Sequence, residues 1–296
     1  MVKKRKAITL FITLAVVVAM LSLVGIVFSY LSQARSQAED KAALIESNLI
    51  YADAVNAVSK FIGKKPSVGT LKNIYQIPLT ISEEKGPFQL LVACSPLRAA
   101  VPISWLREDG NANREEMFSM ASSILDAVAL KHHFKDVNRL KSMLSNAIAS
   151  KYSINFAQEA RLKRAKDFFG WIDFKKVLND YYLLEGDSNV FKPNWRYYFS
   201  FGKEYKAIDG NFLSSKLISI IFNIDEQIAQ EEFKSGYLKN FIIENGLDLE
   251  LYNSKLFAKG AVVALTCNAN YSFGKGSYAF KFNYIDGKVE GFEFIK

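Results

Sequence analysis

The strongest constraint on this chain is a long uncharged segment close to its N-terminus. No charged residue occurs from Ile8 to Leu31, a run of 24 residues. At 1.5 Å per residue, a helix of this length reaches about 36 Å, enough to cross a hydrocarbon core of about 30 Å. A removable secretory signal usually has an apolar core of about 7–15 residues, although Ser32-Gln33-Ala34 offers a small-x-small cleavage sequence. The run therefore predicts a permanent membrane-spanning helix.

The charges on either side of this run predict its orientation. Four basic residues precede it, whereas positive and negative residues are mixed after it. Basic residues are retained on the cytoplasmic side of a membrane. We therefore expect a cytoplasmic N-terminus, with everything after Leu31 across the membrane. The residues that set this topology are Lys3, Lys4, Arg5 and Lys6.

The helix is expected to continue beyond the membrane. Residues 32–62 contain no proline, and their apolar residues recur at three- and four-residue steps, which is typical of an amphipathic helix. Gly63 and Pro66 supply a stop signal, so the pattern predicts one helix from about Ile8 to Phe61. Its second half is expected to pack on a globular head. The residues of the predicted packing face are Ala42, Ile45, Leu49, Ala52, Val55, Val58 and Ile62.

The remaining chain predicts a mixed helix-and-sheet protein. With 50% hydrophobic and 14% aromatic residues, it has ample material for a core. Branched and aromatic residues predict strands at 74–81 and 87–94, joined by a turn at 83–86. Helical periodicity dominates the middle of the chain, with Asp136 and one of Asn211, Ser214 and Ser215 as helix caps. The predicted helices cover 115–133, 137–152, 155–184 and 214–235.

The last fifty residues change period again. Alternating apolar and polar residues predict strands at 261–273, 276–285 and 288–295. Asp286-Gly287 between two of these strands is a strong hairpin signal. We therefore expect a three-stranded antiparallel meander at this end of the chain.

The N-terminal residues resemble those of type IV pilins and type II secretion pseudopilins. A short basic leader is followed by Lys6-Ala7-Ile8-Thr9-Leu10, which opens an apolar helix that later becomes amphipathic. In this family a prepilin peptidase cuts before the first apolar residue, so the resemblance implies a cut between Ala7 and Ile8. The chain departs from the family by having Ala7 where glycine is usual. It also has Ile12 at the fifth mature position, where most members have glutamate.

The absence of this glutamate makes the chain resemble the minor pseudopilin K family of type II secretion systems. A glutamate buried among apolar helices costs several kcal/mol unless it meets a positive partner. In pilins that partner is understood to be the N-terminal amine of the adjacent subunit. Pseudopilin K characteristically lacks the glutamate, is thought to sit at the pseudopilus tip, and carries a helical insertion in a pilin-like head. Trp171-Ile172-Asp173 resembles a segment of that insertion.

Resemblance and element order together predict an α+β, pilin-like fold, in which a long N-terminal helix packs on an antiparallel sheet that carries a large inserted helical subdomain. The predicted segments are a basic leader (1–7), a transmembrane half-helix (8–31), an amphipathic half-helix (32–62), first strands (63–106), the inserted subdomain (107–240) and C-terminal strands (241–296).

The resemblance also implies a location and partners. It implies a single-pass protein of the bacterial inner membrane with a periplasmic head. The expected partners are the lipid bilayer, a prepilin peptidase, and other pseudopilins or envelope-complex subunits that contact the N-terminal helix. Two alternatives stay open, namely a competence pseudopilin whose head meets DNA and an uncut periplasmic adaptor with one span. The net charge of +8 does not decide for DNA, because four positive charges belong to the leader and the others are spread along the chain.

Basic and aromatic residues do occur together in one segment. Lys64-Lys65 and the basic residues of 161–166 would form a face near Phe168, Phe169 and Trp171. This face favours nucleic acid only if the chain serves DNA uptake, and otherwise it is the solvated side of a helix.

Few residues suggest catalysis or metal binding. His132 and His133 are adjacent and so lie about 100° apart on a helix, which prevents both from facing one metal. Gly274-Lys275-Gly276 lacks the spacing of a phosphate loop, and no GxSxG motif occurs. Calcium binding, known in some pseudopilins, has no loop of suitable ligand spacing here. We expect no enzyme and no cofactor. The acidic candidates are Glu115-Glu116, Glu231-Glu232 and the pair Asp248 and Glu250.

The two cysteines, Cys94 and Cys267, both fall on predicted strands. Two cysteines exclude a four-cysteine zinc site. In an oxidising compartment they can form a disulfide that closes a loop of about 170 residues and restricts the unfolded chain by several kcal/mol. The alternative is a pair of buried thiols, since free cysteine packs well in sheets.

Overall fold

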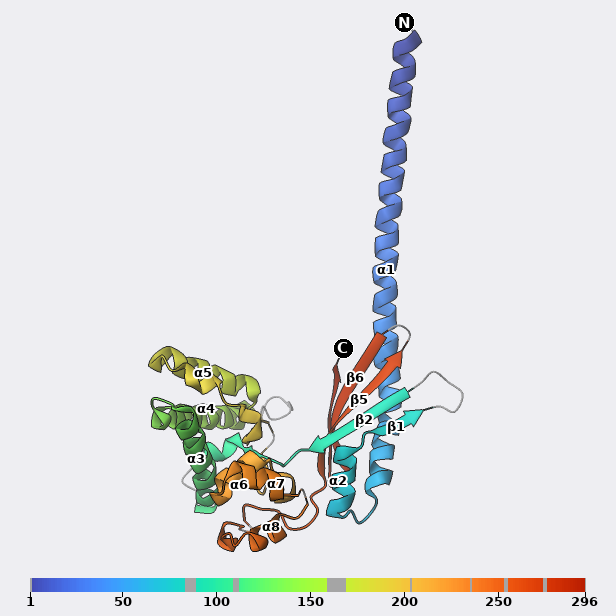
Figure 1. Ribbon diagram of the computed structural model, residues 1–296. Coiled ribbons are helices and arrows are strands. Elements are labelled where there is room, and N and C mark those ends of the chain that lie inside the picture. Colours follow the sequence, from blue (N-terminus) through green and yellow to red (C-terminus); the bar gives the residue numbers. More distant parts are fainter. Residues whose placement is uncertain are drawn as a thin grey trace.

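The computed structural model describes residues 2–82, 89–108, 112–158, 169–202, 204–234, 236–252, 255–273 and 276–295. A long helix packs at one end against an antiparallel sheet, and a helical body lies beside that sheet (Figure 1). We call the helix end with its sheet the pilin-like body, and residues 97–263 the insertion. The predicted α+β class is confirmed.

Helix α1 spans Val2–Ile62 without a break. It ends at Gly63, which adopts φ 71°, a left-handed conformation that favours glycine. The Gly63 amide donates to the Ser59 carbonyl at 3.0 Å. Both the continuous helix and its end therefore agree with the prediction.

The face of α1 that contacts the sheet was predicted only in part. Val58 and Ile62 are buried as expected, but Ile45 and Leu49 each expose 65% of their surface. The buried stripe instead has a strict four-residue step, which places its members on one side of the helix. Apolar residues occupy more than one side of this half-helix, and the sheet covers only one of them. The buried stripe consists of Ile50, Ala54, Val58 and Ile62.

The sheet has the order β1-β2-β5-β6-β7, and all its pairs are antiparallel. One face packs on α1, where Tyr51 contacts Phe280, Phe282 and Phe292 edge-on, with ring centroids 5.1–6.1 Å apart. The predicted C-terminal meander is present, with Asp286 and Gly287 at positive φ in its second turn. The strands are β1 (Leu79–Ser82), β2 (Gln89–Pro96), β5 (Ala264–Phe273), β6 (Gly276–Ile285) and β7 (Lys288–Ile295).

The prediction of a strand over residues 74–81 was wrong for most of its length. Helix α2 occupies Val68–Gln76, and only β1 is a strand there. The hydroxyl of Ser67 caps this helix by accepting a hydrogen bond from the Thr70 amide at 3.1 Å. Leu71 and Ile74, three residues apart, are buried on one helix face. Cap and spacing together outweigh the strand preference of the branched residues, and the predicted turn at 83–86 lies outside the described residues.

The insertion has its own hydrophobic core, which contains Trp105, Phe174 and Trp195 and is separate from the core beneath α1. Its α-helices are α3 (Ala112–His132), α4 (Val137–Gln158), α5 (Trp171–Glu185), α6 (Ser215–Phe222), α7 (Glu226–Glu232) and α8 (Leu238–Glu244). Two short parallel strands, β3 (Val101–Pro102) and β4 (Phe199–Ser200), pair within it. Its 3₁₀ turns are η1 (Ile103–Leu106), η2 (Ser188–Phe191), η3 (Trp195–Tyr197), η4 (Gly210–Phe212) and η5 (Leu249–Leu251).

One predicted helix of the insertion proves to be two. The segment 214–235 contains α6 and α7, separated at Asn223, which adopts φ 51° and ends α6. Ser214 caps α6 by accepting from the Leu217 amide at 3.2 Å, and Asp136 accepts from the Arg139 amide at 2.9 Å at the start of α4. These are two of the predicted caps. For the predicted helix at 155–184, the structure describes α5 from Trp171 onward, and residues 159–168 lie outside the described part.

The insertion leaves and re-enters the sheet at neighbouring points. Leu97 donates its amide hydrogen to the Ala264 carbonyl at 2.9 Å, at the end of the β2–β5 pair. The predicted boundaries at 107 and 240 differ from these points, because α8 crosses residue 240 and residues 249–251 form a 3₁₀ turn where strands were expected. The short elements between 97 and 106 and between 245 and 263 carry no periodic signal.

Candidate functional site

The part of α1 on the N-terminal side of the buried stripe carries a long series of exposed apolar side chains. From Leu14 to Leu49, none of the side chains that the structure describes is buried. Ile26 and Phe28 each expose 67% of their surface. By length and composition, Val16–Ala42 is able to cross a membrane, and none of its apolar window is covered. Exposed apolar surfaces of this extent mark sites that contact a membrane or another protein. We call Leu14–Leu49 the free half of α1.

The leader residues singled out in the sequence belong to the same helix. The backbone of α1 is helical from Val2 onward. Their side chains lie outside the described part of the chain, so the predictions made for them remain predictions. These residues are Lys3, Lys4, Arg5, Lys6, Ala7, Ile8 and Ile12.

A disulfide links β2 and β5 close to Leu97 and Ala264, where the insertion leaves and re-enters the sheet. We call this place the neck of the insertion. Cys94 on β2 and Cys267 on β5 are direct cross-strand partners, and their sulfur atoms are 2.05 Å apart. Both residues are buried against the core beneath α1. The sequence left open either a disulfide or two buried thiols, and the structure contains the disulfide.

A second contact joins the two bodies at α2. Tyr75 packs edge-on against Phe212 of η4, with ring centroids 4.8 Å apart. The Gly236 amide donates to the Asn211 carbonyl at 2.8 Å. Gly236 adopts φ 105°, and a Cβ atom there would lie 2.9 Å from Cγ1 of Val68. Glycine is therefore required both by the backbone conformation and by the close approach of α2. We call this contact the junction.

Asp209 is a buried acid at the junction. It exposes only 2% of its surface, and its Oδ1 accepts a hydrogen bond from the Asn211 amide at 3.1 Å. Burial raises the pKa of the Asp209 carboxyl to about 6, although Asn211 hydrogen bonds and the charge of Arg98 act in the opposite direction. Burial, and to a lesser extent the charge of Asp209, raises the pKa of the Tyr75 hydroxyl well above its ordinary value. Sequence reasoning missed Asp209, because an acid before glycine resembles an ordinary turn.

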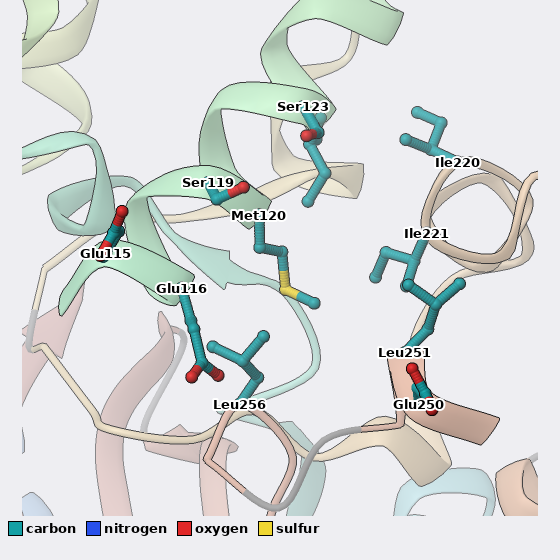
Figure 2. Close-up of a pocket in the computed structure, with 11 residues that line it drawn as sticks. Glu115, Glu116, Ser119, Met120, Ser123, Ile220, Ile221, Glu250, Leu251 and Leu256 are labelled. Atoms are coloured by element: carbon teal, nitrogen blue, oxygen red, sulfur yellow. The ribbon is translucent and has the colours of Figure 1, made fainter. Parts of the chain in front are cut away.

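A groove of about 550 Å³ lies between α3, α6 and η5 (Figure 2). The side chains of Met120, Ile221, Leu251 and Leu256 border this space in the close-up. Three acids from two of the predicted pairs, Glu115 and Glu116 from one and Glu250 from the other, also line it. The structure therefore brings together carboxylates that the sequence left unconnected.

Several of the predicted acids already interact with other residues of the chain. Glu116 forms an ion pair with Lys255. Of the other predicted acids, Asp248 caps η5 through the Glu250 amide at 2.8 Å, and Glu231 accepts from the Gln227 side chain at 2.8 Å. Among the described residues, no three His, Cys, Asp or Glu side chains are grouped to hold a metal ion. No ligand set can therefore be named for calcium.

His132 and His133 lie at the C-terminal end of α3. His133 adopts φ 57° and leaves the helix, so the two rings do not belong to one regular helical turn. Burial, followed by the charge of Lys131, lowers the pKa of His132. The Asn189 side chain donates to the His133 carbonyl at 2.9 Å, which gives this segment a structural contact.

A cleft separates the sheet from the insertion. Two cavities of about 330 and 360 Å³ share the lining residues Leu97, Ser200, Phe201 and Lys281, and so form one elongated space. Arg196 and Trp171 line one end, and Glu293 lines the other. We call this space the interbody cleft.

The aromatic residues near the predicted basic face do not form an open platform. Phe169 is 1% exposed and belongs to the core of the insertion. Trp171 stacks on Phe174 at 5.8 Å between centroids, and both Arg196 and Lys175 approach its ring. Phe168 and the basic residues of 161–166 lie outside the described residues.

These features define a class of fold. A long N-terminal helix whose last turns pack on a five-stranded antiparallel sheet, with a helical insertion between two adjacent strands, is a pilin-like architecture. A chain in the crystal structure of the GspK-GspI-GspJ complex from the enterotoxigenic Escherichia coli type 2 secretion system has the same fold, with a TM-score of 0.58 and 12% identity. The match covers 89% of this chain and 99% of that chain.

The comparison confirms the pseudopilin-like fold predicted from the N-terminal residues. No family model and no curated protein sequence matches the chain. At 12% identity the likeness establishes the fold, and function must be argued from the surfaces described above.

Proposed function

We propose that this chain is a minor, tip-type pseudopilin-like subunit of a type II secretion or related type IV filament machine. In this proposal the free half of α1 holds it in the inner membrane, and both bodies lie in the periplasm. Its work is assembly with other pseudopilins and not catalysis. The observation that carries the proposal is the free half of α1, which continues without a break into a pilin-like body.

The free half of α1 needs a cover in each of its two environments. In the membrane, lipid covers it without any need for a partner. In an assembled filament outside the membrane, the same surface is stable only if other apolar helices cover it, at about 25 cal/mol for each Å² buried. The same exposed surface therefore allows the subunit both to stay in the membrane and to assemble into a filament.

The terminal position is supported by the shape of the chain and by Ile12. The insertion lies beside the sheet at the end of the molecule far from the N-terminus of α1 (Figure 1). A wide body at this end is easier to place at the end of a filament than between closely stacked subunits. Ile12 provides no carboxylate for the amine of a subunit ahead. Both features favour a subunit with neighbours on one side only.

The first experiment measures the N-terminal mass of the full chain purified from a host with a prepilin peptidase. Cleavage between Ala7 and Ile8 gives a mass that begins at Ile8, which supports a pilin-class subunit. The matched variant Ala7→Gly should be cut at least as completely, because glycine is usual in the family. Retention of Met1 by both proteins would favour the uncut periplasmic adaptor.

The second experiment tests assembly through α1. A photo-crosslinking amino acid replaces Leu49, which is 65% exposed on α1, in cells that express the other pseudopilins of the same system. The matched control replaces Leu130, which is 79% exposed on the insertion. We expect crosslinks to other pseudopilins from position 49 and none through position 130. Equal crosslinking from both positions would contradict assembly through the helix.

A further inference from the structure

We propose that the interbody cleft binds an extended, acidic peptide segment of another protein, with Arg196 and Lys281 as the groups that hold its carboxylates. The inference does not depend on membrane insertion or filament assembly.

The cleft contains two cations that form no ion pair in the described part of the chain. Arg196 and Lys281 both line the cavity of about 360 Å³, and no acidic residue lines that cavity. In the described part of the chain, neither side chain has a carboxylate within ion-pair distance or donates a hydrogen bond. A guanidinium offers a planar fork of N–H donors that matches a carboxylate in two parallel hydrogen bonds. The cavity is therefore suited to a negatively charged group.

Arg196 lies against an aromatic ring of its own chain. Its guanidinium carbon lies 5.1 Å from the centre of the Trp171 ring, a cation–π contact. Trp171 is held in turn by Phe201, whose ring centroid is 4.9 Å away at an interplanar angle of 70°. A cation that is held in place before binding loses less conformational entropy when a ligand arrives. The aromatic residues also supply an apolar wall beside the charge.

The shape of the cleft favours a segment of chain over a small anion. The second cavity, of about 330 Å³, continues from the first along the sheet and is lined by Thr266 and Asn283. These two polar side chains are 2.8 Å apart across β5 and β6, and they leave further hydrogen-bonding capacity toward a ligand. Cavities of about 300–1,000 Å³ are typical of ligand sites. Two joined cavities accommodate several consecutive residues.

Glu293 makes the two ends of the cleft differ in charge. It is the cross-strand partner of Lys281 on β7 and lines the end of the cleft far from Arg196. A carboxylate of the ligand is repelled at the Glu293 end and attracted at the Arg196 end. We therefore expect the acidic residues of the ligand to lie at the Arg196 end.

The same residues argue for a peptide over a nucleic acid. Proteins that bind single strands offer an open aromatic face on which bases stack. In this cleft the Trp171 ring is already in contact with Phe174, Lys175 and Arg196. The carboxylate of Glu293 would also repel a phosphate backbone.

The test uses the full chain in detergent and fluorescence anisotropy of a labelled peptide. The probe is fluorescein-labelled Gly-Phe-Asp-Phe-Glu-Gly, and its neutral counterpart has Asn and Gln in place of the two acids. We expect the acidic peptide to bind at least about tenfold more tightly at low salt, because charged hydrogen bonds are about twice as strong as neutral ones. Arg196→Ala and Lys281→Ala should each weaken its binding about tenfold.

Two further variants make the result specific to the cleft. Lys175→Ala removes a cation that also lies over Trp171, at 5.5 Å, but is not part of the cavity lining, so binding should stay unchanged. Glu293→Gln removes the repelling carboxylate and should strengthen binding about two- to threefold. Thermal unfolding of each variant verifies that it is folded. If Arg196→Ala is unfolded, Arg196→Lys replaces it and should weaken binding by losing the fork.

Several outcomes would overturn the inference. They are failure of the acidic peptide to bind, equal binding of the acidic and neutral peptides, and an Arg196 variant that binds like the original chain. Tighter binding of a twelve-nucleotide thymidine strand would assign the cleft to nucleic acid instead. None of these results bears on the crosslinking from position 49, so the peptide site and the filament role are tested separately.

Discussion

Cys94 and Cys267 are directly opposed on adjacent antiparallel strands, three residues inside the points at which the insertion leaves and re-enters the sheet. Their Cα atoms are 4.0 Å apart. The bond therefore ties together the two ends of residues 97–263 at the place where they meet the pilin-like body. It holds the neck of the insertion shut independently of the junction at α2.

Loss of this disulfide should lower stability. A bond that closes a loop of this length restricts the unfolded chain, and removal of a native disulfide typically costs about 2–5 kcal/mol. We expect Cys94→Ala/Cys267→Ala to lower the denaturation midpoint of the full chain in detergent. Reductant should lower the midpoint of the original chain and leave that of the double variant unchanged. An original chain with two titratable thiols and no response to reductant would show that the bond does not form.

Gly210 should tolerate no side chain. A Cβ atom there would lie 2.5 Å from Leu238 and 3.0 Å from Phe257, and both of these residues are buried in the core of the insertion. Gly210→Ala should therefore destabilise the chain by about 1–3 kcal/mol in urea unfolding. The matched change Gly69→Ala in α2 meets only Ser67 Oγ at 3.6 Å, so we expect it to be neutral or to stabilise by up to about 1 kcal/mol. Equal effects of the two variants would contradict the close packing of Gly210 against Leu238 and Phe257.

Asp209 should make stability depend on pH. Burial raises its pKa from 3.8 to about 6, so the folded chain binds the proton more tightly than the unfolded chain does. Its contribution is greatest below pH 3.8 and is lost as the pH rises through 6. Between pH 7.5 and pH 5, the Asp209 carboxyl alone should increase the free energy of unfolding by about 1 kcal/mol.

The measurement for Asp209 is the difference between the original chain and Asp209→Asn. Asparagine keeps an oxygen that accepts from the Asn211 amide but does not titrate. Subtracting the two pH profiles removes the contribution of His132, whose pKa is lowered and which acts in the opposite direction. The other charged or titratable groups that interact with Asp209 are Arg98, Tyr75 and Tyr252. A difference profile that is flat from pH 7.5 to pH 5 would contradict a titrating Asp209.

Two isoleucines of α1 should differ sharply in their effect on the head. Ile50 is 5% exposed against the sheet, whereas Ile45, five residues earlier on the same helix, is 65% exposed. Ile50→Ala should destabilise the chain by about 2 kcal/mol or more, and Ile45→Ala by less than about 0.5 kcal/mol. Urea unfolding in detergent measures both. A loss of similar size from Ile45→Ala would contradict the exposed position of Ile45, and the buried stripe would then begin before Ile50.

Local signals account for the parts of the fold that the sequence predicted well. The end of α1 follows from Gly63, and the C-terminal meander follows from alternation and Asp286-Gly287. Helix α2 was missed because its capping serine outweighed a strand-like composition. The packing face of α1 was only partly predicted, since apolar residues such as Ile45 and Ile50 look alike until the sheet covers one of them.

The binding surfaces could not be predicted from local patterns, because they join distant segments. Arg196 follows Trp195 in η3, Trp171 begins α5, and Lys281 lies on β6, so only the folded chain brings them to one cleft. Glu115 on α3 and Glu250 on η5 likewise line one groove only in the folded chain. Asp209 gives no signal in the sequence, because its raised pKa comes from burial at the junction.

The adjacent exit and entry points of the insertion have a consequence for how this architecture can change. Leu97 and Ala264 are already hydrogen-bonded neighbours, so a short hairpin turn is geometrically sufficient to connect β2 with β5. Of the described residues from 97–263, none is fully buried in the core beneath α1, and the strands of this sheet all lie outside that range. A lineage can therefore enlarge, exchange or discard this domain while the rod and its sheet keep the same strand pairing.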